Sequence, residues 1–98
     1  MKNLKLVFLI FDEGVRPDIM EVLEKHGIKG WTTWKNNSGN GEGGPKQGTA
    51  IWPGLNDVIM MAVEEEKVQP MIDDVHEVQD SFPVRPGIRF IVTDAQFC

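Results

Sequence analysis

The residues best suited to binding chemistry form a glycine-rich stretch in the middle of the chain. From Ser38 to Gly48 the sequence reads SGNGEGGPKQG. Glycines let backbone N–H groups converge on an anion, and Lys46 adds a positive charge, so a phosphate-bearing ligand fits this stretch. It has no P-loop pattern, and no dinucleotide-binding pattern stands between a strand and a helix. A mobile linker enriched in Gly and Asn is the alternative interpretation.

Two arginines near the end of the chain supply a second candidate for anion binding. Arg85 and Arg89 flank the dipeptide Pro86-Gly87. If this turn abuts the glycine-rich loop of a neighbouring subunit, two guanidinium groups and several backbone N–H groups meet an anionic ligand there. The alternative, weighed equally, is that both arginines form surface ion pairs with the abundant carboxylates.

Other reactive residue types give little basis for chemistry. Cys98 is the last residue, and no arrangement of Ser, His and Asp for nucleophilic catalysis is readable from the sequence. His26 and His76 lie in predicted helices and are interpreted as surface or capping residues. Met60 and Met61 are adjacent in a predicted strand and point to opposite faces, which favours core packing over a soft-metal site.

The elements that must position these residues follow from hydrophobic periodicity. Short apolar or alternating runs predict four strands: Leu4–Phe11, Trp31–Lys35, Asp57–Val63 and Ile88–Val92. A first helix is predicted from Pro17 to His26, because Ile19, Val22 and Leu23 share one face and Gly27 follows as a C-cap. A second helix carries its apolar face on Val68, Met71, Ile72, Val75 and Val78.

The connections between these elements are also predicted. A long loop without regular structure is expected from Asn36 to Asn56, closed by Trp52-Pro53-Gly54, with the Trp52 ring anchoring the loop more than presenting a binding surface. An acidic turn, Glu64–Glu66, is expected before the second helix, with Pro70 in the first helical turn. Ser81–Gly87 is a turn-rich break, and the tail from Thr93 is expected to be disordered or docked on a neighbour.

The order of the elements predicts an α+β, ferredoxin-like βαββαβ fold. In this fold a four-stranded antiparallel sheet carries both helices on one face, and strands one and three are central. Both central strands are apolar on both sides, so the face without helices exposes more apolar surface than the ~300–600 Å² patch of a typical monomer. We therefore expect a homo-oligomer built sheet to sheet.

Length and composition limit the class of protein. The 98 residues suit one domain, residues 1–98, and a single Cys favours a reducing compartment. No signal peptide or membrane span is expected, which makes the cytoplasm the predicted location. A net charge of −5 argues against nucleic acid as a partner.

In two stretches the chain resembles the PII signal-transduction proteins and their PII-like relatives. Gly27–Thr32 reads GIKGWT, like the family's GIxGxT stretch entering strand two, and Gly87–Val92 reads GIRFIV, like its fourth strand. The resemblance implies a homotrimer that binds an adenine nucleotide between subunits and engages a target protein through the long loop. Carried over by position, it implies a cleft lined by Thr32, Gly39, Gly41, Gly87 and Arg89.

Departures from that family modify the expected ligand. The chain contains no Tyr, which excludes control by tyrosine modification of the loop, and it lacks the family's basic C-terminal segment and its Arg-Gln-Lys-Gly run. The resemblance therefore implies a less charged nucleotide or another small anion more than a triphosphate. The alternatives are a trimeric metal-binding protein like the CutA group and a small ferredoxin-like enzyme. The favoured expectation is a sensor that is not an enzyme and that has no certain cofactor.

Overall fold

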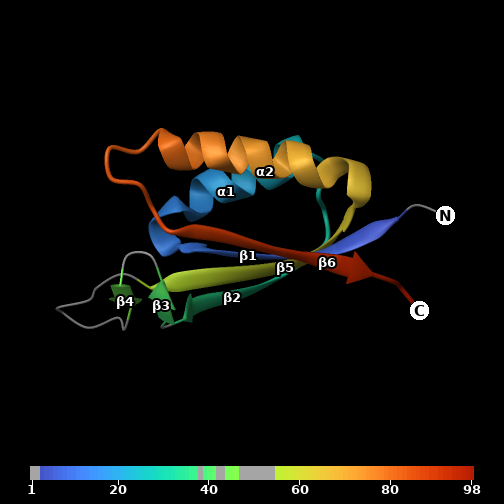
Figure 1. Cartoon of the computed structure of the whole chain (residues 1–98), viewed down its shortest axis with the longest axis horizontal. Coiled ribbons are helices and arrows are strands. Elements are labelled where there is room, and N and C mark those ends of the chain that lie inside the picture. Colours follow the sequence, from blue (N-terminus) through green and yellow to red (C-terminus); the bar gives the residue numbers. More distant parts are fainter. Residues whose placement is uncertain (1–2, 38, 42–43, 47–54) are drawn as a thin grey trace.

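The computed structural model describes residues 3–37, 39–41, 44–46 and 55–98. Two helices cover one face of a four-stranded sheet, and no described element covers the other face (Figure 1). In chain order the elements are β1 (Leu4–Asp12), the 3-10 helix η1 (Glu13–Val15), α1 (Arg16–Lys25), β2 (Trp31–Asn37), β3 (Gly39–Gly41), β4 (Gly44–Lys46), β5 (Asn56–Glu64), α2 (Glu65–Asp80) and β6 (Ile88–Ala95). The predicted ferredoxin-like α+β fold is confirmed.

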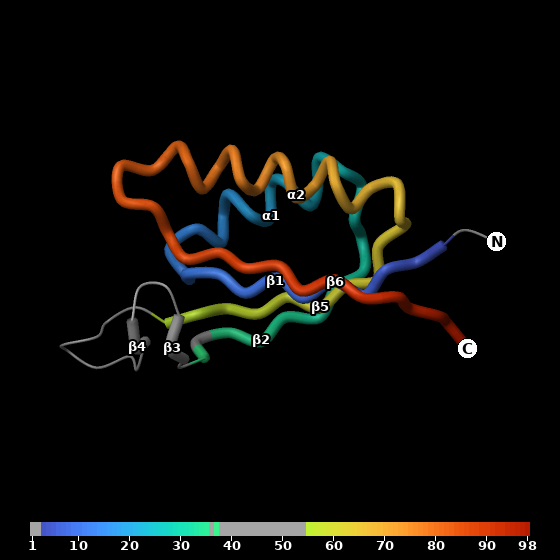
Figure 2. Tube along the Cα trace, viewed as in Figure 1, coloured from blue at the N-terminus to red at the C-terminus, as the bar shows by residue number. Residues whose placement is uncertain are grey.

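The sheet has the strand order β2-β5-β1-β6, with every pairing antiparallel. The first and third predicted strands, β1 and β5, are central, as expected. Phe8 pairs with Met60 on one side and with Ile91 on the other, and this register fixes which residues share a face. Both described ends of the chain lie at the same end of the sheet, as the trace in Figure 2 shows.

The core lies between the sheet and the helices. Val7, Leu9 and Phe11 of β1 are fully buried, and so is Ile59 of β5, because their side chains point toward α1 and α2. The helices add further buried side chains, among them Ile19, Leu23, Met71 and Val75. Full burial of a large apolar side chain contributes about 1.5–3 kcal/mol, so this layer provides most of the stability of the fold.

The opposite face of the sheet is also apolar but only partly buried. It carries Leu4, Leu6, Phe8 and Ile10 of β1, Val58, Met60 and Ala62 of β5, and Ile91 of β6. We call these eight residues the open sheet face. Ile91 is 49% exposed.

The first helix ends as its sequence predicts. His26 is the C-cap residue, and Gly27 has a φ of 69°, a left-handed conformation that glycine adopts at little cost. The N–H of Gly27 donates to the Glu24 carbonyl, and the N–H of Ile28 donates to the Leu23 carbonyl. This cap turns the chain toward β2.

The second helix differs from the prediction at its start. Glu64 ends β5 and Glu65 begins α2, so there is no separate acidic turn, and Pro70 lies inside the helix instead of in its first turn. Because the Asn3 carbonyl accepts a hydrogen bond from the Glu65 N–H at 2.9 Å, α2 starts directly at the end of the sheet. The early start places Pro70 five residues later than Glu65, where its ring removes one helical N–H.

The predicted loop and tail contain more strand than expected. The prediction of a loop without regular structure from Asn36 to Asn56 is wrong in part, because β2 continues to Asn37 and β3 pairs with β4 in a separate two-stranded sheet. The tail prediction is also wrong in part, since β6 continues to Ala95 and pairs with Leu4. In both segments backbone pairing extends the sheet beyond the residues whose side-chain pattern identified the strands.

Candidate ligand-binding site at the start of β6

Most of the predicted binding residues gather at one end of the sheet. This end holds the start of β6 with Gly87 and Arg89, the last residue of β1, and the β3–β4 hairpin (Figure 1). The Asp12 N–H donates to the Gly87 carbonyl at 3.0 Å, which ties the turn before β6 to the end of β1. A Cβ atom added at Gly87 meets no other atom within 4 Å, so open space adjoins the backbone at this position.

Arg89 and Thr32 share a face of the sheet but lie at opposite edges. Arg89 pairs with Ile10 and Thr32 pairs with Met60, so both side chains belong to the open sheet face side, and both residues are exposed. Neighbouring strands are about 4.8 Å apart, which places β6 and β2 about 14 Å from one another across β1 and β5. The structure therefore does not bring these two predicted site residues together within one chain.

Trp34 is the edge residue opposite Arg89. It pairs with Val58, which pairs with Ile10, so Trp34, Val58, Ile10 and Arg89 form one row across the sheet. Trp34 is 46% exposed, which is a large exposure for an indole.

Arg85 lies in the turn after α2, and its side chain is held by the last two residues of that helix. Its Nη2 donates to Gln79 Oε1 at 3.0 Å, and its Nε donates to Asp80 Oδ1 at 3.3 Å. The Arg85–Asp80 contact is the surface ion pair that the sequence offered as an alternative to ligand binding. Its side chain is nevertheless 57% exposed, so one side of the guanidinium still faces solvent.

The glycine-rich stretch is described in part. Gly39 and Gly41 lie in β3 and Lys46 lies in β4, where Gly39 pairs with Lys46 and Gly41 with Gly44. The hairpin brings three of the predicted site residues into one small sheet. The predicted anchor, Trp52-Pro53-Gly54, lies outside the described residues.

Sequence reasoning missed an ion pair at this end of the sheet. Arg16 Nε donates to Asp57 Oδ2 at 2.8 Å, and Asp57 is only 2% exposed. Arg16 Nη2 lies 2.7 Å from the same oxygen but without the alignment of a hydrogen bond, so that contact is electrostatic. The Arg16 guanidinium also lies 5.7 Å from the centroid of the Phe11 ring. The pair joins the start of α1 to the start of β5, 41 residues apart.

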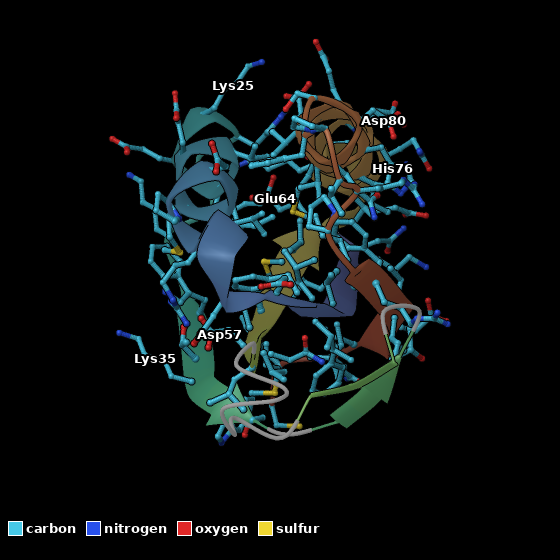
Figure 3. All side chains as sticks on the ribbon, turned by 90° about the vertical axis from the view of Figure 1, so that its left-hand side faces the viewer. Lys25, Lys35, Asp57, Glu64, His76 and Asp80 are labelled. Atoms are coloured by element: carbon cyan, nitrogen blue, oxygen red, sulfur yellow. The ribbon has the colours of Figure 1, made fainter. Side chains whose placement is uncertain are left out.

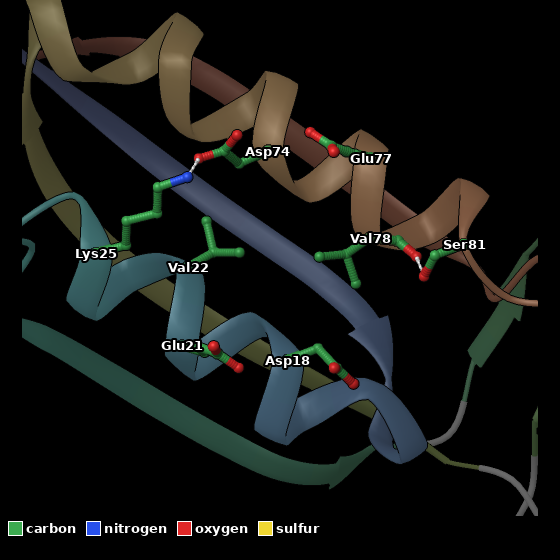
Figure 4. Close-up of a pocket in the computed structure, with 8 residues that line it drawn as sticks. All are labelled: Asp18, Glu21, Val22, Lys25, Asp74, Glu77, Val78 and Ser81. Carbon is green, nitrogen blue, oxygen red and sulfur yellow. Dashed lines mark hydrogen bonds and ion pairs between the residues drawn. The ribbon is translucent and has the colours of Figure 1, made fainter.

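A cavity of about 330 Å³ lies away from the predicted site, in the groove between α1 and α2 (Figure 4). Its lining consists of Asp18, Glu21, Val22, Lys25, Asp74, Glu77, Val78 and Ser81. Lys25 Nζ contacts Asp74 Oδ2 at 3.0 Å, which leaves three further carboxylates in the lining. An excess of negative charge disfavours a phosphate-bearing ligand, so the groove is not an alternative anion site.

Asp74 also connects the two helices. His26 Nε2 lies 2.5 Å from Asp74 Oδ2, and both side chains are mostly buried. The hydrogen bond with His26, followed by that from Lys25, lowers the pKa of Asp74 below its ordinary value of 3.8. His26 therefore serves as a helix-capping residue that also packs α1 against α2.

The described residues give no sign of a metal centre or of a membrane span. Among them, no group of three or more His, Cys, Asp or Glu side chains is arranged to hold a metal ion. Met61 and Met71 are buried in the core, in agreement with the packing role predicted for them, whereas Met60 lies on the open sheet face and is only partly buried. No described helix is long and apolar enough to cross a bilayer.

Solved structures of PII-like proteins match this fold over nearly the whole chain. CPII, a nitrogen regulatory PII-like protein from Thiomonas intermedia K12, was solved bound to ADP, AMP and bicarbonate. It matches with a TM-score of 0.78 at 24% identity, over 98% of this chain and 93% of that chain. A candidate PII-like signalling protein from Thermus thermophilus matches with a TM-score of 0.70 at 24% identity, over 96% of this chain and 88% of that chain.

A third solved structure extends the likeness to a more distant sequence. A DUF3240 family protein from Shewanella baltica matches with a TM-score of 0.66 at 15% identity, over 94% of this chain and 89% of that chain. No protein-family model matches the sequence, and no curated protein does. At these identities the likeness concerns the fold, and the predicted structural resemblance to PII-like proteins is confirmed.

Proposed function

We propose that this chain is a cytoplasmic PII-like sensor consisting of one domain, residues 1–98. It assembles as a homotrimer and binds an adenine nucleotide or another small anion at the clefts between subunits. The bound ligand regulates a partner protein through residues 36–56, and the chain does not convert the ligand chemically. The effector site comprises Thr32, Gly39, Gly41, Lys46, Arg85, Gly87 and Arg89.

The relation between Thr32 and Arg89 is the observation that carries this proposal. A ligand touching both residues of one chain must lie across about 14 Å of sheet whose centre is Phe8, Ile10, Val58 and Met60. A charged ligand gains nothing from such an apolar surface. In a closed ring the β2 edge of one copy meets the β6 edge of the next. Thr32 of one copy then lies near Arg89 of its neighbour, and the ligand does not have to span the apolar sheet.

The open sheet face supports the assembly. Contiguous apolar surface of this extent is characteristic of a protein–protein interface. Burial of its eight side chains against other copies contributes about 25 cal/mol for each Å² removed from water. Figure 3 shows the arrangement end-on, with both helices on one side of the sheet and no helix on the other.

Native mass spectrometry of freshly purified protein tests the assembly and reports any retained nucleotide. Isothermal titration calorimetry with ADP, AMP and bicarbonate then tests binding. Gly87→Ala is the informative variant, because the structure has room for the new methyl group within one chain. We expect unchanged unfolding and binding at least tenfold weaker, since the methyl group occupies space next to the ligand. A monomer, or a trimer that binds none of the three compounds, contradicts the proposal.

A further inference from the structure

Gln79 is the most buried uncharged polar side chain among the described residues. It is 2% exposed and occupies the position after Met71 and Val75 in the buried stripe of α2, where the helical period calls for an apolar residue. A buried amide is retained only when its hydrogen-bonding groups are satisfied, because an unpaired one costs about 1–3 kcal/mol. The partners of Gln79 therefore indicate what it does.

Both ends of the Gln79 amide contact the segment that precedes β6. Nε2 donates to the Pro86 carbonyl at 2.8 Å, and Oε1 accepts from Arg85 Nη2 at 3.0 Å. The two bonds fix the orientation of the amide, since a carbonyl needs a donor and a guanidinium needs an acceptor. One rigid helical residue thus holds both the backbone of the turn and the side chain of Arg85.

The contacts continue from the turn to the proposed site. Gly87, the next residue after Pro86, accepts the hydrogen bond from the Asp12 N–H and leads directly into β6 with Arg89. The segment is thus fixed on one side by α2 and on the other by β1. A site built on a turn gains affinity when that turn is ordered before the ligand arrives.

We propose that Gln79 is a positioning residue for ligand binding, and this proposal rests on the function proposed above. Gln79 does not touch the ligand. It acts on the ligand through Arg85: its Oε1 holds the partly exposed guanidinium in the orientation that meets an anion, and its bond to the Pro86 carbonyl orders the turn that carries Arg85.

A double-mutant cycle in ADP affinity tests the connection through Arg85. Gln79→Met removes both hydrogen bonds at similar volume, and we expect binding about tenfold weaker. Arg85→Ala should weaken ADP binding by a similar factor, and the double variant should bind no more weakly than Arg85→Ala alone, because Gln79 acts through Arg85. Effects of the two substitutions that multiply, or wild-type affinity in Gln79→Met, overturn the proposal.

Gln79→Glu tests the two hydrogen bonds of Gln79 separately. Its carboxylate keeps an acceptor for Arg85 but places an oxygen instead of a donor against the Pro86 carbonyl, so we expect a less stable protein whose ADP affinity lies between those of Gln79→Met and wild type. Affinity as weak as that of Gln79→Met overturns the assignment to Arg85.

Hydrogen exchange without ligand distinguishes failure of this proposal from failure of the proposed function. Residues 84–88 should exchange faster in Gln79→Met than in wild type. They should be unchanged in the control Ser81→Ala, whose hydroxyl bonds only to the Val78 carbonyl one turn earlier. Absence of binding of ADP, AMP and bicarbonate by wild type overturns the proposed function, whereas unchanged exchange in Gln79→Met overturns the positioning role.

Discussion

Arg16 donates a hydrogen bond from Nε to Asp57 Oδ2 at 2.8 Å, and this contact fastens the start of α1 to the start of β5. The Asp57 carboxylate is almost completely buried, while the Arg16 side chain is 22% exposed. Removing one partner of such a pair leaves the other charge without compensation. The contact is therefore more important to the fold than a surface ion pair of the same geometry.

Replacing Asp57 with Ala should destabilise the protein by about 3 kcal/mol, because the Arg16 guanidinium loses its counterion in a mostly buried position. Urea unfolding followed by circular dichroism measures the change. Glu21→Gln, at an exposed position of α1 that no described ion pair uses, is the matched control and should stay within about 0.5 kcal/mol of wild type. An unfolding midpoint of Asp57→Ala equal to that of the control contradicts this assignment.

A charge on the open sheet face should disrupt the assembly while preserving the fold. Phe8→Glu places a carboxylate at the centre of this face, and we expect sedimentation velocity to show monomers at micromolar concentration. Val84→Glu, at a hydrophobic position that is 85% exposed and outside the sheet, should keep the wild-type sedimentation coefficient. Loss of assembly in both variants would point to a general effect of charge instead of this interface.

Mixing two inactive variants tests whether each ligand site is shared between subunits. Arg89→Ala and Thr32→Trp should each abolish binding in a pure trimer, the first by removing charge and the second by blocking the cleft. After unfolding and refolding together in equal amounts, about one site in four should combine the intact Thr32 of one copy with the intact Arg89 of the next. Calorimetry with ADP measures the recovered stoichiometry. No recovery from properly assembled mixed trimers means that both residues act within one chain.

The contact between Asp74 and His26 predicts a dependence of stability on pH. Because the folded protein lowers the pKa of Asp74, this carboxylate stabilises the fold above its ordinary pKa of 3.8 and loses that contribution as the pH falls toward the lowered value. Asp74→Asn should therefore be less stable than wild type at pH 6, and the difference should shrink below pH 3.8. Asp73→Asn is the control, since Asp73 accepts its hydrogen bond from Gln69 of the same helix. A difference independent of pH contradicts the assignment.

Substitutions at two glycines test whether the left-handed backbone at Gly27 requires glycine. Gly27→Ala should destabilise the fold by about 1 kcal/mol, because an L-residue is strained at a φ of 69°. Gly30→Ala should be nearly neutral, since no atom lies within 4 Å of the added Cβ and its φ is not in the left-handed region. Thermal unfolding of both variants measures the contrast, and equal melting temperatures would exclude a capping role for Gly27.

The strands and the first helix were predictable because each has a local signal. Leu4–Phe11 is a continuous β-rich run, and Ile19, Val22 and Leu23 share a helical face that ends at Gly27. Local signals misled at the start of the second helix. Three consecutive Glu residues suggested a turn, which placed Pro70 in the first helical turn. In the structure the hydrogen bond from the Glu65 N–H to the Asn3 carbonyl starts the helix at Glu65. The β3–β4 hairpin was missed because glycines have no side chains from which to read a period of two.

The contacts around the site were harder to predict. Some of them join residues that are distant in the sequence, and one involves a buried glutamine, a residue type that is usually exposed. Nothing near Arg16 in the sequence identifies Asp57 as its partner. Gln79 follows Met71 and Val75 at helical spacing, which was a usable signal, but a glutamine is ordinarily interpreted as solvent-facing. Thr32 and Arg89 were correctly placed on strands, and their separation across the sheet followed from the predicted order with strands one and three at the centre.

Adjacent residues of β1 and β5 are subject to different constraints. A substitution at Val7, Leu9 or Ile59 alters the core of a single chain, whereas one at Phe8, Ile10 or Met60 alters the open sheet face, through which we propose that copies associate. In one strand, alternate positions therefore determine two separate properties, the packing of the core and the composition of the open sheet face. If copies associate through the open sheet face, a lineage can change that association through every second residue and still inherit the same folded chain.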